Sequence, residues 1–171
     1  KPSLRQRSKA ALFELKPLLD RINDEVEQPD YINNDPVQFM HMFQKKTDQE
    51  IAGFLAATMA WGRRDIVVDK VGELIERMRY SPFDFVMSYT QSDFPLLDGF
   101  KHRTFKPIDI HGLVLALQTI YQKYADLEAF WKDCYIAGKK QSRPFLAIFD
   151  ERFFSFSPDI ASRTRKHVSN P

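Results

Sequence analysis

Hydrophobic positions along this chain recur mostly at three- and four-residue spacing, which is the period of one face of an α-helix. The first such run predicts a helix or a helix pair over 12–26, in which Pro17 either opens the second piece or kinks a single helix. The sequence contains no alternating run of β-branched residues bounded by hairpin turns, which is the usual signal of a strand. The pattern therefore predicts an all-α protein.

Helix start and stop signals divide the next part of the chain. Asp35-Pro36 is typical of an N-cap followed by proline at the first helical position, and it predicts a helix through Phe43. Thr47-Asp48-Gln49-Glu50 has the pattern of a capping box. The nearly continuous apolar run 51–61 follows, which indicates a helix buried on most sides. We expect Gly62 to end that helix, as a glycine commonly does.

The rest of the chain is predicted to form further helices separated by short connections. We expect Asp126 to cap one of them and Gly138 to end it. The polar, proline-containing stretch 90–107 is the one place where a seam would fall, so we expect a single helical domain over 1–171 with a possible seam there. The predicted helices cover 65–80, 82–89, 108–124, 127–137 and, opened by Ser142-Arg143-Pro144, residues up to about 156.

Composition narrows the class of protein. The 171 residues include 43% hydrophobic and 28% charged side chains, which are ordinary values for a globular protein. The formal net charge of +2 is too small to indicate a nucleic-acid partner, so local clusters must decide that question. The single cysteine, Cys134, excludes a disulfide within the chain and indicates a reducing, cytoplasmic location. No apolar run approaches the roughly 18 residues of a membrane span, so no membrane partner is predicted.

Most catalytic motifs are missing from the sequence. The four histidines are scattered, and none pairs with a second histidine or a cysteine at the spacing of a zinc site, so no metal is predicted. The six glycines are isolated, so there is neither a serine nucleophile elbow nor a phosphate-binding loop, and no cofactor is predicted. Although 23 carboxylates offer many acid–base pairs, nothing singles one out, and the catalytic residues stay unassigned.

Positive charge is concentrated in three short segments. Basic residues interleaved with aromatic ones can anchor a loop while they present cations to phosphates. The alternative is a solvated loop held by two core phenylalanines and, near the termini, solvated tails. The segments are Lys101, His102, Arg103 and Lys106 between Phe100 and Phe105; Arg163, Arg165, Lys166 and His167; and Lys1, Arg5, Arg7 and Lys9.

The sharpest feature is the turn Trp61-Gly62-Arg63-Arg64. The chain leaves an apolar helix, turns at a glycine and enters an amphipathic helix, so two arginines and an indole emerge together. Backbone amides at the start of the second helix can also contact phosphate. The alternative makes Trp61 a core residue, Gly62 a cap and both arginines solvated surface.

Residues 50–70 resemble the second and third helices of the helix-hairpin-helix DNA glycosylases. Asp65 and Val68-Asp69-Lys70 match the pattern of those enzymes, in which an apolar helix ends in a short polar turn. The turn departs from the pattern, because many glycosylases place there a glutamine that enters the duplex. The resemblance implies an all-α, multi-helical domain like the helical half of such a glycosylase.

The chain is also similar to the bacterial family called domain of unknown function 2400. The likeness rests on the Asp35-Pro36 helix, the Trp61-Gly62-Arg63 turn, the segment 99–105, and Arg163 with Lys166-His167. Members of that family are longer, so this chain resembles their N-terminal part. The glycosylase hairpin needs two glycines separated by one residue, and the sequence has no such pair. The resemblance therefore implies that the hairpin and the catalytic aspartate lie beyond Pro171.

These observations lead to a hypothesis of DNA binding, related to base-excision repair. One alternative is a non-enzymatic helical module that binds protein or RNA, which predicts a buried Trp61 and dispersed basic segments. Another is an enzyme acting on a small molecule in an aromatic-lined pocket, which predicts a deep cavity. The sequence does not indicate an oligomeric state. At the turn, the residues predicted to contact DNA are Trp61, Gly62, Arg63 and Arg64. The residues predicted to contact the DNA backbone are Lys101, His102, Arg103, Arg165 and Lys166.

Overall fold

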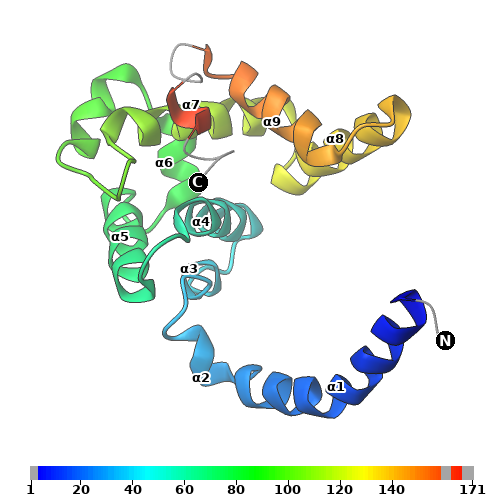
Figure 1. Ribbon diagram of the computed structural model, residues 1–171. Helices are drawn as coiled ribbons and strands as arrows, with labels where there is room; N and C mark the ends of the chain where they lie inside the picture. Colours follow the sequence, from blue (N-terminus) through cyan, green and yellow to red (C-terminus); the bar gives the residue numbers. More distant parts are fainter. Residues whose placement is uncertain (1–3, 159–162, 167–171) are drawn as a thin grey trace. The chain divides into compact units, whose positions relative to one another are not determined.

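The computed structural model of the chain describes residues 4–158 and 163–166, with side chains from residue 13 onward. Within these ranges every regular element is a helix, as Figure 1 shows, and the all-α prediction is confirmed. The β-type pairing found in the described residues is one isolated antiparallel bridge between His102 and Phe105. None of the helices in the described part of the chain is both long and apolar enough to cross a bilayer.

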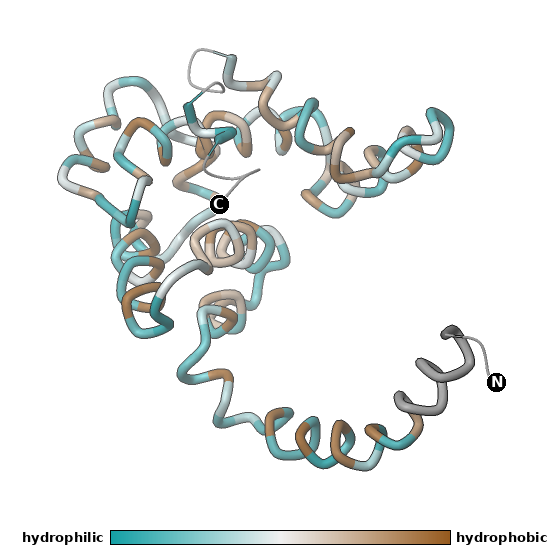
Figure 2. The backbone as a smooth tube through the Cα atoms, in the orientation of Figure 1, coloured by the Kyte–Doolittle hydropathy of each residue, from teal (hydrophilic) through white to brown (hydrophobic). Residues whose placement is uncertain are grey.

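Backbone contacts divide the chain into two compact units, Lys1–Asp35 and Pro36–Pro171. The first contains α1 (Leu4–Val26) and α2 (Pro29–Ile32), and Pro17 lies inside one continuous α1. The boundary between the units follows Asp35, and the stretch 90–107, where the sequence suggested a possible seam, lies inside the second unit. Figure 2 shows apolar positions at intervals along α1. Several of its large apolar side chains are exposed, namely Leu15, Leu18, Leu19, Ile22 and Val26.

The second unit is built around α4 (Lys46–Met59). This helix packs against α3, α5, α6 and α8, because apolar residues occupy most of its circumference. Ile51, Leu55 and Met59 are completely buried, which agrees with the helix predicted from the run 51–61. The other elements of this unit are α3 (Gln38–His41), α5 (Arg64–Arg77), α6 (Pro82–Ser88), the 3-10 helix η1 (Gln91–Leu97), α7 (Pro107–Lys123), α8 (Leu127–Gln141) and α9 (Phe145–Ser155).

Aromatic rings join α4 to the hairpin of α8 and α9. The rings of Phe54 and Phe153 lie 5.2 Å apart, those of Phe149 and Phe153 5.4 Å, and those of Trp131 and Phe149 4.5 Å. Pairs of this kind add about 0.5–1.5 kcal/mol beyond the area that they bury. The high phenylalanine content of the sequence therefore holds this hairpin to the core.

The predicted end of α8 at Gly138 is wrong. The helix continues to Gln141 and ends at Ser142, whose φ is 52°. A Cβ at Gly138 would lie 2.9 Å from the carbonyl oxygen of Arg143, so glycine is required where the returning chain crosses the helix. The glycine thus marks a close approach of backbone and not a helix end.

Two predicted helix starts also differ from the structure. The Asp35-Pro36 helix is reduced to α3, which has four residues and begins at Gln38. The capping box at Thr47 does not form, because α4 begins at Lys46. Glu50 instead accepts hydrogen bonds from the amides of Leu127 at 3.0 Å and Glu128 at 3.2 Å, at the start of α8. The unpaired amides of that neighbouring helix compete successfully for its carboxylate.

A candidate nucleic-acid interface

The turn between α4 and α5 depends on glycine. Gly62 has a φ of 113°, which side-chain-bearing residues rarely adopt. A Cβ on Gly62 would lie 2.9 Å from Nη1 of Arg103, so a larger residue would also displace that guanidinium. The helix ends at Met59, before Gly62, and the amide of Trp61 bonds back to the Met59 carbonyl at 2.8 Å. The predicted turn is therefore present, although it begins earlier than expected.

Trp61 lies between the apolar core and the loop 101–106. Its ring centroid is 6.4 Å from those of His102 and Phe105, with steep interplanar angles of 83° and 69°. The guanidinium carbon of Arg103 lies over the indole, 4.6 Å from the ring centroid. Trp61 is half-buried, so it is neither the wholly buried core residue of one hypothesis nor a freely exposed ring.

His102, which the sequence predicts as a contact to the DNA backbone, is buried in the structure. Only 2% of its surface is exposed, and its Nε2 lies 3.0 Å from the Met59 carbonyl oxygen. Burial lowers the pKa of His102, because desolvation disfavours the charged imidazolium. A buried neutral ring cannot meet a phosphate, so His102 instead holds the loop against the end of α4.

The two arginines of the turn have different surroundings. Arg63 forms a two-pronged ion pair with Asp65, at 3.1 Å and 2.6 Å, and this pairing lowers the pKa of Asp65. Arg64 is the first residue of α5 and is exposed. Lys101 is also exposed, and within the described ranges neither Arg64 nor Lys101 has an ion-pair partner. Arg64 and Lys101 are therefore both available to an anion.

The segment 163–166 is attached to the loop 101–106 through a buried carboxylate. Arg163 donates to the Thr104 carbonyl at 3.1 Å and to Asp109 at 2.9 Å and 3.2 Å. The Thr164 hydroxyl donates to the other oxygen of Asp109 at 2.9 Å. Asp109 has no exposed surface, so its hydrogen bonds with Arg163 and Thr164 are shielded from water and hold the segment in place. Two segments that are about 60 residues apart in the sequence thus lie side by side.

The basic residues of segment 163–166 are not equivalent. Arg165 forms an ion pair with Asp150 of α9, whereas Lys166 is exposed. His167, the last residue of the predicted cluster, lies outside the described residues, and the side chains of the cluster within 1–9 do as well.

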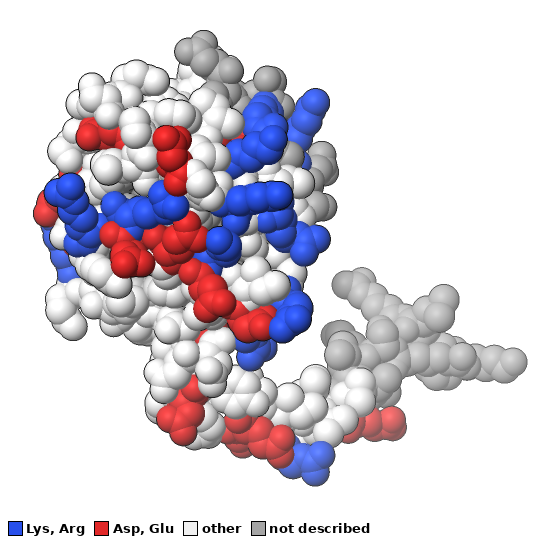
Figure 3. Space-filling model, turned by 90° about the vertical axis from the view of Figure 1, so that its left-hand side faces the viewer, with Lys and Arg blue, Asp and Glu red and all other residues white. Residues whose placement is uncertain are grey.

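Three segments therefore make up one surface, which we call the basic surface: 61–64, 101–106 and 163–166. Arg103 joins the first to the second, and Thr104 joins the second to the third. Figure 3 shows lysine and arginine side chains along the right-hand edge of the pictured face and also across its middle and left, where carboxylates lie among them.

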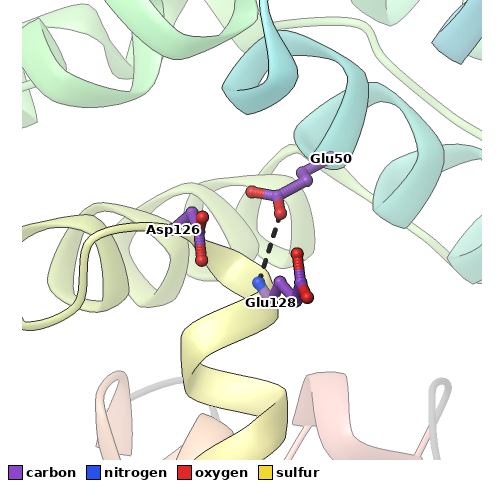
Figure 4. A group of neighbouring side chains, drawn as sticks. All are labelled: Glu50, Asp126 and Glu128. Carbon is purple, nitrogen blue, oxygen red and sulfur yellow. Dashed lines mark hydrogen bonds between the residues drawn. The ribbon is translucent and has the colours of Figure 1, made fainter.

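A cluster of carboxylates at the start of α8 was not predicted from the sequence. Oxygens of Glu50, Asp126 and Glu128 lie within 4.8 Å of one another (Figure 4). The ammonium of Lys46 lies 2.7 Å from Asp126, 2.6 Å from Glu128 and 3.6 Å from Glu50, and its hydrogen bonds with Asp126 and Glu128 raise the pKa of Lys46. Asp126 caps α8 as predicted, accepting the amide of Ala129 at 2.8 Å. The ammonium of Lys46 and the amides at the start of α8 are the partners of these carboxylates, so the cluster has a structural role in holding α4 to α8.

A cavity of about 480 Å³ lies at the other end of α5 from the Gly62 turn. Polar side chains at its rim include Arg79, Asp84 and Asp93. Arg79 and Tyr80, which connect α5 to α6, both have a φ of 53°, an unfavourable conformation for side chains of their size. The cavity gives the small-molecule hypothesis a definite location.

Comparison with known proteins places the chain in a family. The sequence model described as "Protein of unknown function (DUF2400)" matches residues 35–171, which is most of the chain and includes the whole basic surface. No curated protein and no solved structure matches the chain. The predicted family is thus confirmed, and the chain belongs to the DUF2400 family.

Proposed function

We propose that this protein binds DNA through the basic surface. The observation that carries the proposal is the packing of three basic segments, distant in sequence, against one another through Arg103 and Thr104. Phosphate contacts supply most of the affinity in sequence-independent DNA binding, and they require cations held at neighbouring positions. The positive end of the α5 dipole lies at the same turn and adds to the attraction for an anion.

The surroundings of each cation refine the proposed contact set. Arg63 and Arg165 are already paired with carboxylates, and His102 is buried, so we do not assign a phosphate contact to these three residues. The side chains left to meet phosphates are exposed and have no ion-pair partner among the described residues: Arg64, Lys101, Arg103, Lys106 and Lys166.

The proposal extends to DNA repair through the likeness of residues 50–70 to the helix-hairpin-helix glycosylases. We propose that the second unit corresponds to the helical half of such an enzyme and that this chain is the N-terminal part of a longer protein. The turn that carries glutamine in many glycosylases carries Trp61 here. We therefore assign the turn to DNA recognition and assign no catalytic residue.

The other hypotheses make different predictions from this one. A protein-binding or RNA-binding module was expected to have dispersed basic segments, whereas 61–64, 101–106 and 163–166 are adjacent. A small-molecule enzyme would use the cavity beside Arg79 and Asp93, at the opposite end of α5. Alanine at Arg79 would then abolish ligand binding and leave DNA affinity unchanged.

The test is the affinity for duplex DNA, measured by fluorescence anisotropy near 0.1 M salt. Loss of two phosphate contacts in Arg64→Ala/Lys101→Ala should weaken binding roughly 10- to 60-fold. The matched control, Lys132→Ala/Lys140→Ala, removes the same charge from exposed positions on α8 and should change the affinity less than about twofold. Equal losses in the two double variants, or no binding even at low salt, would refute the proposal.

A further inference from the structure

The contact between Arg103 and Trp61 is unusual for a surface arginine. Arg103 is exposed and has no carboxylate partner in the described part of the chain, so the indole face is what holds its guanidinium. Such a contact is weak at an exposed site. The backbone of Arg103 also has a φ of 53°, which non-glycine residues adopt with some strain. The guanidinium is therefore held loosely over the ring.

Hydrogen-bonding capacity is left unused around the same indole. Nε1 of Trp61 is buried and has no hydrogen-bond partner in the part of the chain that the structure describes, and the same is true of Nδ1 of His102. When Nε2 of His102 donates to the Met59 carbonyl, Nδ1 is an acceptor, whereas the indole N–H is a donor. Buried polar atoms without protein partners are rare in native proteins, and an ordered water, an ion or a bound group commonly meets them.

We propose that Arg103 is a displaceable cover over Trp61 and that an unpaired nucleobase of single-stranded DNA takes its place. The inference rests on the proposed DNA binding and names the part of the DNA that Trp61 recognises. A base and a guanidinium are both flat groups that stack on an indole. Stacking on the indole face is the contact that we propose, because the buried N–H of Trp61 lies in the plane of the ring and a base above that face does not reach it.

Displacement also gives Arg103 a better partner. Once it leaves the ring, its guanidinium can bind the phosphate next to the stacked base, and a bidentate phosphate contact is stronger than an exposed cation–π contact. Gly62 lies directly beside the guanidinium and has no side chain to obstruct this movement. Trp61 itself stays in place, because His102 and Phe105 hold its ring from the core side.

Stacking on Trp61 requires a base with a free face. In a duplex both faces of each base are covered by its neighbours, and opening the stack costs a few kcal/mol of free energy. The half-buried Trp61 is fixed to the core, so it serves as a platform for a base that is already unpaired. Single-stranded or locally opened DNA should therefore bind more tightly than a regular duplex of equal charge.

The experiment uses Trp61 as its own reporter. The chain has two tryptophans, so in the Trp131→Phe variant all tryptophan emission comes from Trp61. This variant is titrated with oligothymidylate, with an abasic oligonucleotide of the same length, and with a duplex. We expect oligothymidylate to quench the emission and the abasic strand to bind without quenching. In addition, Trp61→Leu should lose roughly 5- to 150-fold in affinity for oligothymidylate, whereas Trp61→Phe should stay close to the parent protein.

The variant Arg103→Ala tests the cover. Its Trp61 emission in the free protein should shift to longer wavelength, because the ring is uncovered, while circular dichroism stays unchanged. Equal quenching by abasic and base-bearing strands would overturn the stacking proposal. Salt-dependent binding of all three nucleic acids with no change in Trp61 emission would overturn it as well, but would leave the proposed function standing. Failure to bind any nucleic acid is a distinct result, which would refute the proposed function itself.

Discussion

Removing the charge of Asp109 should loosen the joint between α7 and the segment 163–166. The carboxylate is completely buried and accepts four hydrogen bonds: from the amide of Lys106 at 2.9 Å, from two nitrogens of Arg163 at 3.2 Å and 2.9 Å, and from Thr164 at 2.9 Å. Asparagine has nearly the same shape and can keep the bond from Lys106. The substitution Asp109→Asn therefore removes mainly the charge that holds Arg163.

The magnitude follows from the burial of the two partners. Removing one member of a fully buried ion pair costs about 3–5 kcal/mol, because the other charge is left buried and uncompensated. The Arg163 side chain is 40% exposed and can regain water, which reduces the expected loss to about 2–3 kcal/mol. Since Lys166 belongs to the released segment, DNA affinity should also fall, by up to about eightfold if one phosphate contact is lost.

Urea unfolding of the full chain at neutral pH measures this loss of free energy. The matched control is Glu151→Gln, which breaks an arginine–carboxylate pair with Arg143 whose side chains are 49% and 40% exposed. That change should lower the free energy of unfolding by no more than about 1 kcal/mol, because an exposed ion pair rarely contributes more than this. If Asp109→Asn costs no more than Glu151→Gln, the buried carboxylate is not the joint that the geometry indicates.

Three further predictions follow from the same structure. Burial lowers the pKa of His102 and of His111, so the unfolded chain binds more protons, and the unfolding free energy should fall as the pH drops from 7 to 5; a flat profile in urea titrations would contradict this. Gly62→Ala should lower the melting temperature more than Gly99→Ala, because the φ of 113° at Gly62 lies farther from the left-handed region open to alanine than the φ of 76° at Gly99; equal melting temperatures would contradict this. Deleting 1–35 should leave the helicity and cooperative unfolding of the second unit intact, as circular dichroism can check; a collapse of its melting transition would show that the two compact units depend on each other.

Local signals in the sequence predicted much of the helical framework. The spacing of apolar residues indicated α5, α7 and α8 to within a few residues, because their buried faces repeat at the helical period. Asp126 was correctly predicted as a cap, since its partner, Ala129, is three residues away. Signals of this kind depend only on neighbours along the chain.

Features that depend on distant parts of the chain were missed or misassigned. Glu50 was assigned to its own helix but caps α8, and Gly138 was assigned to a helix end but allows the chain to cross at Arg143. His102 lies in a basic segment of the sequence, which is typical of a surface contact, yet its ring is buried and its Nε2 lies 3.0 Å from the Met59 carbonyl oxygen. Nothing in the local pattern around Asp109 indicated that it would anchor Arg163. Such pairings are fixed only when the helices pack together.

The most direct test of the central claim is the salt dependence of DNA affinity. The logarithm of the association constant for duplex DNA should fall linearly with the logarithm of the salt concentration, with a slope of about −3 to −4.5 if three to five phosphates are neutralised. In Arg64→Ala/Lys101→Ala the slope should become shallower by about 1.8, whereas Lys132→Ala/Lys140→Ala should keep the parent slope. A slope near zero, or the same slope in all three proteins, would contradict DNA binding through the basic surface.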